Sequence, residues 1–306
     1  MNQVRLEGNC KAPNIELQIH AILKAPPNSR QLKHDMEWLT TKHIDHFTLS
    51  GGGILDGQGE QGWQQNDCKN SQSCNKLPNN LSFNFLTNSI ISDITSLDSK
   101  LFHINVLGCK NLTFNGINIK APAESLNTDG IHVARSRGVN ITNSQIGTGD
   151  DCISIGSLGK TPGELPVVGV FVQNCTFIGT DNGVRVKTWP ASHDGVVRDL
   201  HFEDIIVQNV SNPVVINQVY FPYNQCKRDI SKVSFKNIKG TSRTQEAMQL
   251  VCSKGVPCEG VEIGDTDIKY SGESEGPTKS TCQNVDPSLV GKQHPPVCST
   301  TPAQSS

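Results

Sequence analysis

The stretch VFVQN at residues 170–174 decides the fold, because close variants of it recur along most of the chain. In each copy two apolar residues alternate with polar ones before an Asn, Asp or Gly, as in a half-buried strand that ends in a turn. The copies are Leu112–Gly116, Val139–Asn143, Val170–Asn174, Leu200–Asp204, Val233–Asn237 and Val261–Asp265. They begin 27, 31, 30, 33 and 28 residues apart. This spacing is typical of a solenoid, in which each repeat forms one rung that stacks on the next.

A second phrase lies between these copies and reads as another short strand. Its copies are Gly130–Val133, Cys152–Ile155, Gly183–Val186 and Pro213–Ile216. Two strands per period with no amphipathic helix between them favour an all-β fold, a right-handed single-stranded parallel β-helix. A β-sandwich or barrel also has many short strands, but it does not need them to recur at one rung length.

The β-helix is predicted to cover residues 1–270, with one long excursion at residues 56–80. From residue 271 onward the sequence is polar and rich in Gly and Pro. We therefore expect residues 271–306 to form a cysteine-tied loop followed by a frayed tail.

The charge balance argues against several classes of binding protein. The 306 residues include 27 basic and 29 acidic side chains, a net charge of −2, without a block of Lys and Arg. A dedicated nucleic-acid or membrane-surface binder needs a concentrated basic footprint. No apolar run approaches the roughly 20 residues that span a bilayer. We expect no nucleic-acid partner and no membrane association.

Eleven cysteines point to an oxidising compartment, and their odd number leaves at least one thiol without an intramolecular partner. Cys68 with Cys74, and Cys252 with Cys258, have the spacing of small disulfide loops. Neither pair has a second Cys/His pair nearby that would complete a zinc site. Five Asn-X-Ser/Thr sequons also suggest a glycosylating route, at Asn80, Asn111, Asn140, Asn174 and Asn209. No apolar signal core follows the first residues, so a secretion signal would have to precede them.

Three carboxylates stand at the starts of consecutive strand phrases: Asp129 in NTDG, and Asp150 with Asp151 in GDDC. On stacked rungs these positions lie above one another, so at least one carboxyl should have a raised pKa and keep its proton near neutral pH. A protonated acid beside an ionised base is what glycosidic-bond hydrolysis requires.

The next rung adds two cations, Arg185 and Lys187, which are two residues apart on one strand and therefore point to one side. Cations beside an acid cluster suit a substrate that bears carboxylates of its own. Taken singly, each motif has a plainer interpretation, as a turn, a calcium-ligand pair or an exposed strand edge. Their succession on neighbouring rungs favours a common site.

The sequence resembles the polygalacturonases, family 28 of the glycoside hydrolases, and within them the plant exopolygalacturonases of the pollen type. The motifs that carry the resemblance are SGGGILDGQG at residues 50–59, NTD at 127–129, GDD at 149–151 and RVK at 185–187, with SLGK at 157–160 and YNQCK at 223–227. The resemblance implies a parallel β-helix that hydrolyses α-1,4-linked galacturonic acid in pectin with inversion, in an exo manner.

The resemblance also assigns roles to residues. Asp150 would be the general acid, Asp129 and Asp151 would activate the water, Arg185 and Lys187 would hold substrate carboxylates, and Asn127 would orient the site. It implies neither cofactor nor metal, polygalacturonic acid or pectin as the partner, a monomer, and secretion to the cell wall.

The chain departs from the family pattern after Gly156. There the family has a further rung with a Gly-His-Gly histidine, whereas here GDDCISIG at residues 149–156 runs directly into SLGK. A solenoid can lose a whole repeat and restack, but catalysis tolerates misplaced groups poorly. We therefore expect weak turnover or none. An inactive pectin-binding homologue is the alternative, and a calcium-dependent lyase is a more distant one. The N-terminal part of the family pattern is also missing, so the first rung is expected to be an uncovered edge.

The missing rung also bears on the cysteines. By the family pattern its loss leaves Cys152 without a partner, and Cys226 and Cys10 are expected to be unpaired as well. The remaining eight cysteines can form four bridges. We expect Cys68–Cys74, Cys252–Cys258 and Cys282–Cys298, with Cys109–Cys175 as the fourth.

Overall fold

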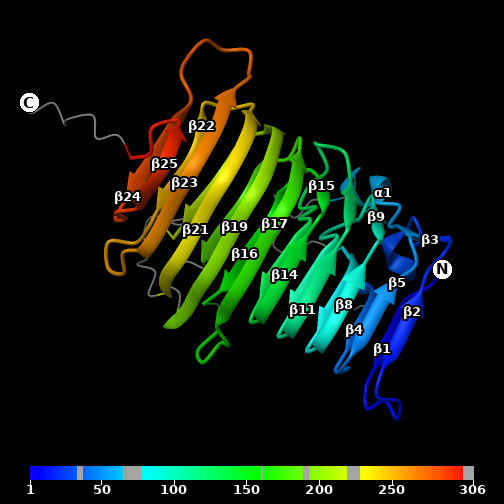
Figure 1. Ribbon diagram of the computed structural model, residues 1–306. Coiled ribbons are helices and arrows are strands. Elements are labelled where there is room, and N and C mark those ends of the chain that lie inside the picture. Colours follow the sequence, from blue (N-terminus) through cyan, green and yellow to red (C-terminus); the bar gives the residue numbers. More distant parts are fainter. Residues whose placement is uncertain are drawn as a thin grey trace, which may run out of the picture.

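In the computed structural model the chain winds into a parallel β-helix whose rungs follow one another from the N-terminus to the C-terminus (Figure 1). The structure describes residues 1–32, 37–64, 66, 77–159, 161–188, 193–218 and 228–298. Neighbouring strands pair in parallel, as in β13 with β16 and β17 with β19. The fold expected from the repeats is confirmed.

The first of two sheets, called sheet 1, has ten strands and carries the candidate site. In sheet order they are β1 (Val4–Glu7), β4 (Glu37–Lys42), β7 (Asn79–Asn84), β10 (Ile104–Leu107), β13 (Ile131–Ala134), β16 (Asp151–Leu158), β18 (Asn182–Thr188), β20 (Asn212–Asn217), β22 (Glu246–Val251) and β24 (Lys279–Gln283). The second phrase of the sequence forms the strands of this sheet from β13 to β20.

The other sheet, sheet 2, has fifteen strands and is built around the VFVQN-like phrase. One run is β2 (Ile15–Gln18), β5 (Phe47–Ser50), β8 (Thr87–Ser92), β11 (Lys110–Asn115), β14 (Arg137–Thr142), β17 (Val167–Ile178), β19 (Gly195–Val210), β21 (Arg228–Ser242), β23 (Glu259–Tyr270) and β25 (Ser288–His294). The other is β3 (Ile22–Lys24), β6 (Ile54–Asp56), β9 (Thr95–Leu97), β12 (Asn118–Lys120) and β15 (Gln145–Gly147), which joins the first run at β17.

The core is built from the apolar residues of each phrase, which point inward and stack in rows along the axis. One row of sheet 2 runs through Phe114, Ile141, Val172, Phe202 and Phe235, all at most 1% exposed. The rings of Phe202 and Phe235 stack at 5.1 Å. Burial of such rows supplies the main driving force for stacking one rung on the next.

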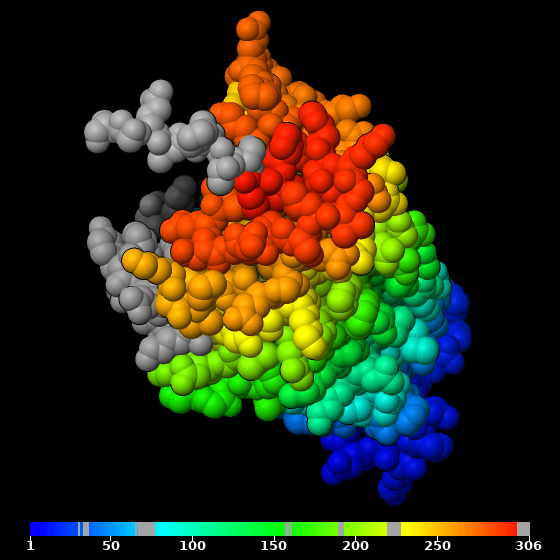
Figure 2. Space-filling view, turned by 60° about the vertical axis from the view of Figure 1, so that its left-hand side comes forward, coloured from blue at the N-terminus to red at the C-terminus, as the bar shows by residue number. Residues whose placement is uncertain are grey.

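The C-terminal segment continues the solenoid before it ends. Strand β24 pairs with β22 in sheet 1, β25 pairs with β23 in sheet 2, and a disulfide joins Cys282 to Cys298. Figure 2 shows these last strands, in orange and red, covering this end of the molecule.

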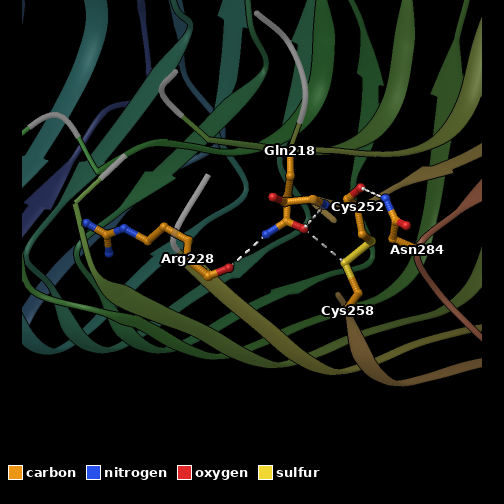
Figure 3. The surroundings of a disulfide bond; sticks show 6 residues. Gln218, Arg228, Cys252, Cys258 and Asn284 are labelled. Atoms are coloured by element: carbon orange, nitrogen blue, oxygen red, sulfur yellow. Dashed lines mark hydrogen bonds between the residues drawn. A yellow bond between two sulfur atoms is a disulfide. The ribbon is translucent and has the colours of Figure 1, made fainter. Parts of the chain in front are cut away.

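A second disulfide, Cys252–Cys258, closes a short loop after β22 (Figure 3). Gln218 ties this loop to the start of β21, because its Nε2 donates to Arg228 O at 2.8 Å and its Oε1 accepts from Ser253 N at 2.9 Å. Asn284 Nδ2 donates to Cys252 O at 2.9 Å. One buried amide therefore joins the disulfide loop to the start of β21.

The expected Cys109–Cys175 bridge is wrong, because both residues are buried free thiols. Cys109 N donates to Ser136 Oγ just before β14, whereas Thr176 N, next to Cys175, donates to Ser144 O just after β14. The two thiols therefore lie at opposite ends of that strand. Cys10 and Cys152 are free, as expected. Cys68, Cys74 and Cys226 lie outside the described residues.

The excursion after β6 begins with a short helix, α1 (Glu60–Gln64), and β3 is followed by a 3-10 turn, η1 (Ser29–Gln31). Lys100 fixes the start of the excursion, since its buried ammonium donates to Gly57 O. Among the described residues, no helix has the length and hydropathy of a membrane span.

Candidate active site

Three carboxylates meet at the outer face of sheet 1. Asp129 lies just before β13, Asp151 begins β16, and Gly130 N donates to Asp151 O at 2.7 Å, which places the two turns on neighbouring rungs. Asp150 precedes Asp151, and one oxygen from each of the three carboxylates lies within 4.8 Å of the others. The juxtaposition expected from the sequence is therefore present.

Hydroxyl groups below the carboxylates hold the two turns together. Thr128 Oγ1 accepts from Gly149 N at 3.1 Å and from Thr148 Oγ1 at 2.6 Å, and it also contacts Ser125 Oγ at 2.7 Å. A Cβ on Gly149 would lie 2.0 Å from Ser125 O, so only glycine fits there. This packing fixes the position of Asp150 relative to Asp129.

The two cations of β18 bind these carboxylates directly. Lys187 Nζ lies 2.6 Å from Asp151 Oδ2 and 3.4 Å from Asp129 Oδ2. Arg185 Nη1 lies 3.3 Å from Asp151 Oδ1. The sequence predicted that both side chains point to the acid cluster, but it assigned them to the substrate's carboxylates.

Gly156 in β16 makes room for this contact. A Cβ at residue 156 would lie 2.7 Å from His132 Cε1 and 3.1 Å from Lys187 Cε. The aliphatic part of Lys187 therefore crosses the sheet over Gly156 to reach the carboxylates.

Three polar residues that the sequence motifs did not indicate contact the cluster. Ser154 Oγ donates to Asp129 Oδ2 at 2.7 Å, His132 Nδ1 is 2.7 Å from Ser154 Oγ, and Asn182 Nδ2 donates to Asp151 Oδ1 at 2.8 Å. His132 also stacks on Phe102 at 4.8 Å. A signal for Asn182 was present, because it precedes the phrase of its rung as Asp151 precedes the phrase of the rung before.

Asn127, expected to orient the site, lies exposed at a turn with a φ of 55°. Asn127 is not among the described residues that contact the carboxylates.

The environment separates the pKa values of the acids. Burial, together with the charges of Asp129 and Asp151, raises the pKa of Asp150 to about 8. Burial would also raise the pKa of Asp129, but the Lys187 ammonium, His132 and Ser154 outweigh it and hold that pKa below the usual range. Lys187 is itself buried, yet Asp129 and Asp151 raise its pKa above the ordinary lysine value. Near neutral pH the site therefore holds a protonated Asp150 beside an ionised Asp129.

Within the described part of the chain, these carboxylates are the one group whose geometry could hold a metal ion. Lys187 already neutralises two of them, so a divalent cation would have to displace its ammonium.

Comparison with known proteins places this site in a family. Residues 1–294 match the model for glycosyl hydrolases family 28. The chain belongs to this family. This family 28 chain is 63% identical to a polygalacturonase from Nicotiana tabacum, covering 100% of this chain and 83% of the relative. It is 48% identical to an exopolygalacturonase from Oenothera organensis, covering 99% and 91%.

The alignment with the Nicotiana relative has 334 positions, against 306 residues in this chain, an excess of 28. The relative therefore has at least that many residues with no counterpart here. The excess is close to one rung, since successive phrases begin 27 to 33 residues apart.

Solved structures share the fold of this family 28 chain. An endo-xylogalacturonan hydrolase from Aspergillus tubingensis superimposes with a TM-score of 0.73 at 22% identity, over 89% of this chain and 82% of its own. An exopolygalacturonase from Thermotoga maritima gives 0.68 at 18% identity, over 94% and 81%.

Proposed function

We propose that this family 28 chain is a glycosidase of the polygalacturonase type, which cleaves α-1,4-galacturonosyl linkages in pectin. The observation that carries the proposal is the cluster of three carboxylates, in which the surroundings raise the pKa of Asp150 and lower that of Asp129. The polygalacturonase names of its relatives, at 63% and 48% identity, support the substrate class.

In this reaction Asp150 gives its proton to the glycosidic oxygen while water attacks the anomeric carbon, and a carboxylate takes a proton from that water. Asp129 suits the second role, because its Oδ1 is buried and accepts no hydrogen bond from the described residues. Asp151 is more constrained, with Asn182, Arg185 and Lys187 all bound to it.

We also propose that hydrolysis inverts the configuration at the anomeric carbon. The family resemblance implies inversion, whereas carboxyl groups within 4.8 Å are closer than the roughly 6.5–9.5 Å usual for inverting pairs. Proton NMR of the first product formed distinguishes the two courses. We expect the β-anomer from the α-linked substrate, and initial release of the α-anomer would overturn this.

We further propose that turnover is weak because a rung is missing between β16 and β18. Stacked directly on β16, Arg185 and Lys187 bind the catalytic carboxylates and are not available to the substrate. The 28-position excess in the alignment supports the loss of one rung.

A non-catalytic pectin-binding protein is the second candidate, and the engaged cations favour it. Reducing-end release from polygalacturonate separates the two, with Asp150→Asn as the control. We expect a slow rate that Asp150→Asn abolishes. Binding of polygalacturonate with no release above the variant would instead establish the binding protein.

A calcium-dependent lyase is the third candidate, and Lys187 argues against it by occupying the place a cation would take. Absorbance from an unsaturated uronide that depends on calcium would identify a lyase. We expect none with or without chelator.

Exo attack, a monomeric state and secretion to the cell wall complete the proposal. The name of the Oenothera relative supports exo attack, and two disulfides support an oxidising compartment. Chromatography of early products tests the first, since exo attack releases single galacturonate units.

A further inference from the structure

The outer face of sheet 2 carries a row of side chains that the proposed reaction does not use. At one register position the strands β11, β14, β17, β19 and β21 carry Thr113, Asn140, Phe171, His201 and Ser234. The strands lie side by side in Figure 1. Asn140 begins the sequon Asn-Ile-Thr, and Phe171 is its partner on the next rung.

Phe171 presents an aromatic face to this sequon. Phe171 is 46% exposed, and its ring stacks on His201 at 4.9 Å with 21° between the planes. Ser234 Oγ lies 2.8 Å from His201 Nδ1 and fixes that ring from the following rung. Because the stack runs along the axis of the solenoid, the other face of Phe171 is turned toward the preceding rung, where Asn140 stands.

The side-chain amides of the other sequons are in different surroundings. Asn80 is buried, and its Nδ2 donates to Leu55 O, Ser96 Oγ and Leu97 O. In turns along the solenoid, Asn111 donates to Asn88 Oδ1 at 2.8 Å and Asn174 to Asn143 Oδ1 at 2.7 Å. Asn209 lies where the register of β19 shifts. By contrast, the amide of Asn140 has no hydrogen-bond partner within the described part of the chain.

We infer that Asn140 is an N-glycosylation site whose first N-acetylglucosamine packs on the open face of Phe171. In the transfer, Asn140 Nδ2 loses a proton and bonds to C1 of the sugar, while the lipid pyrophosphate of the donor leaves. The C–H groups of a pyranose then cover an aromatic face that water covers otherwise. The site lies on sheet 2, away from the carboxylates on sheet 1.

The experiment uses the full chain secreted from a eukaryotic host. Peptide mass spectrometry is expected to show a glycan on Asn140 and none on Asn80. After trimming to a single N-acetylglucosamine, the acetamide methyl should show an upfield ring-current shift that is lost in Phe171→Ala. Removing the glycan by Asn140→Gln should lower Tm in the wild type but not in the Phe171→Ala background.

Ile90 provides the matched control, because it is 48% exposed in the same row but is separated from Asn140 by Thr113. In an Ile90→Ala background the Tm loss from Asn140→Gln should be as large as in the wild type.

An unmodified Asn140 in a protein glycosylated elsewhere overturns the site. A glycan whose methyl shift and Tm effect survive Phe171→Ala overturns the packing. Reducing-end release should be the same in Asn140→Gln and the wild type, which separates this test from that of the proposed function.

Discussion

At the scale of single residues, the raised pKa of Asp150 suits a general acid but lowers the stability of the fold near neutral pH. Its pKa is about 8 in the folded protein against an ordinary value of 3.8, so the folded state holds a proton that the unfolded state has lost between those pH values. Stability contributed by this group is therefore present below pH 3.8 and is lost as the pH rises toward 8. We predict that Asp150→Asn abolishes hydrolysis yet is more stable than the wild type by on the order of 2 kcal/mol near pH 7.

Urea unfolding at pH 4, 6 and 8 checks this prediction. The gap between the variant and the wild type should widen with pH, because only the wild type loses stability as the pH rises from 3.8 toward the raised pKa of Asp150. A gap that stays constant or narrows would show that Asp150 is ionised in the folded protein. If the wild type turns over, its rate should fall about tenfold per pH unit above 8 as the acid is lost.

Lys187 is the residue on which the ionised carboxylates depend. Lys187→Met leaves Asp129 and Asp151 in a largely buried site with fewer cations, and we predict a loss of about 2–4 kcal/mol in unfolding free energy at pH 7. Because the pKa of Asp129 is lowered in the fold, its stabilising contribution is present above pH 3.8 and is lost as the pH falls below it. The cost of the substitution should therefore shrink at acid pH.

An exposed ion pair serves as the control for Lys187. Lys236 lies 2.7 Å from Glu262 on the outer face of sheet 2, and Lys236→Met should change stability little at any pH. Equal losses in the two variants would mean that Lys187 contributes only packing.

At this scale the sequence predicted the three carboxylates because each opens a strand phrase, and stacking then brings them together. It did not predict the binding of Lys187 to Asp129, because that contact depends on how far β18 lies from β13. It did not indicate a role for His132, which rung stacking places 2.7 Å from Ser154.

At the scale of one element, β16 is shaped by a glycine that its partners require. Gly156→Ala would place a methyl group 2.7 Å from His132 Cε1 and 3.1 Å from Lys187 Cε. We predict that Lys187 is displaced from the carboxylates and that stability at pH 7 falls by about 1–3 kcal/mol. The loss should be smaller at acid pH, as for Lys187→Met. Gly264→Ala in β23 is the control, because its Cβ would meet atoms at an ordinary 3.5 Å. A loss independent of pH would indicate a clash without displacement of Lys187.

The elements also show where sequence patterns stop being informative. Alternating apolar residues predicted the strands because each phrase fills the same inward row. The Cys109–Cys175 pairing failed because spacing along the chain does not say at which corner of a rung a thiol lies. Relative to their phrases, Cys109 precedes Leu112 by three residues, whereas Cys175 follows Val170 by five. Comparing those offsets would have rejected the pair.

At the scale of the whole molecule, deleting one rung of a solenoid moves the functional groups on either side of it closer together by the spacing of one rung. Each rung adds about 4.8 Å along the axis, and each contacts its neighbours alone, so one rung can be lost while the core rows stay continuous. In the structure β16 pairs directly with β18, and their inward residues Ile153 and Val184 stack in register, which is the arrangement that the proposed loss requires. We therefore expect the loss of a rung to leave the fold intact and to shorten the distance between the acids and the cations.

The dependence of the acid–cation distance on the number of rungs predicts what the insertion of one rung would do. Inserting a rung taken from the Nicotiana relative between Gly156 and Ser157, where we propose that one is missing, should move Arg185 and Lys187 about 4.8 Å further from the carboxylates. The cations would then be available to the substrate, and reducing-end release from polygalacturonate should rise at least tenfold. The cost of Lys187→Met in unfolding free energy should fall at the same time. The same insertion with its histidine replaced by alanine is the control. Since it restores the spacing alone, it should lower the cost of Lys187→Met to the same extent but raise the rate less. If the unmodified chain already hydrolyses polygalacturonate as fast as the insertion variant, the stacking of β18 on β16 does not limit turnover.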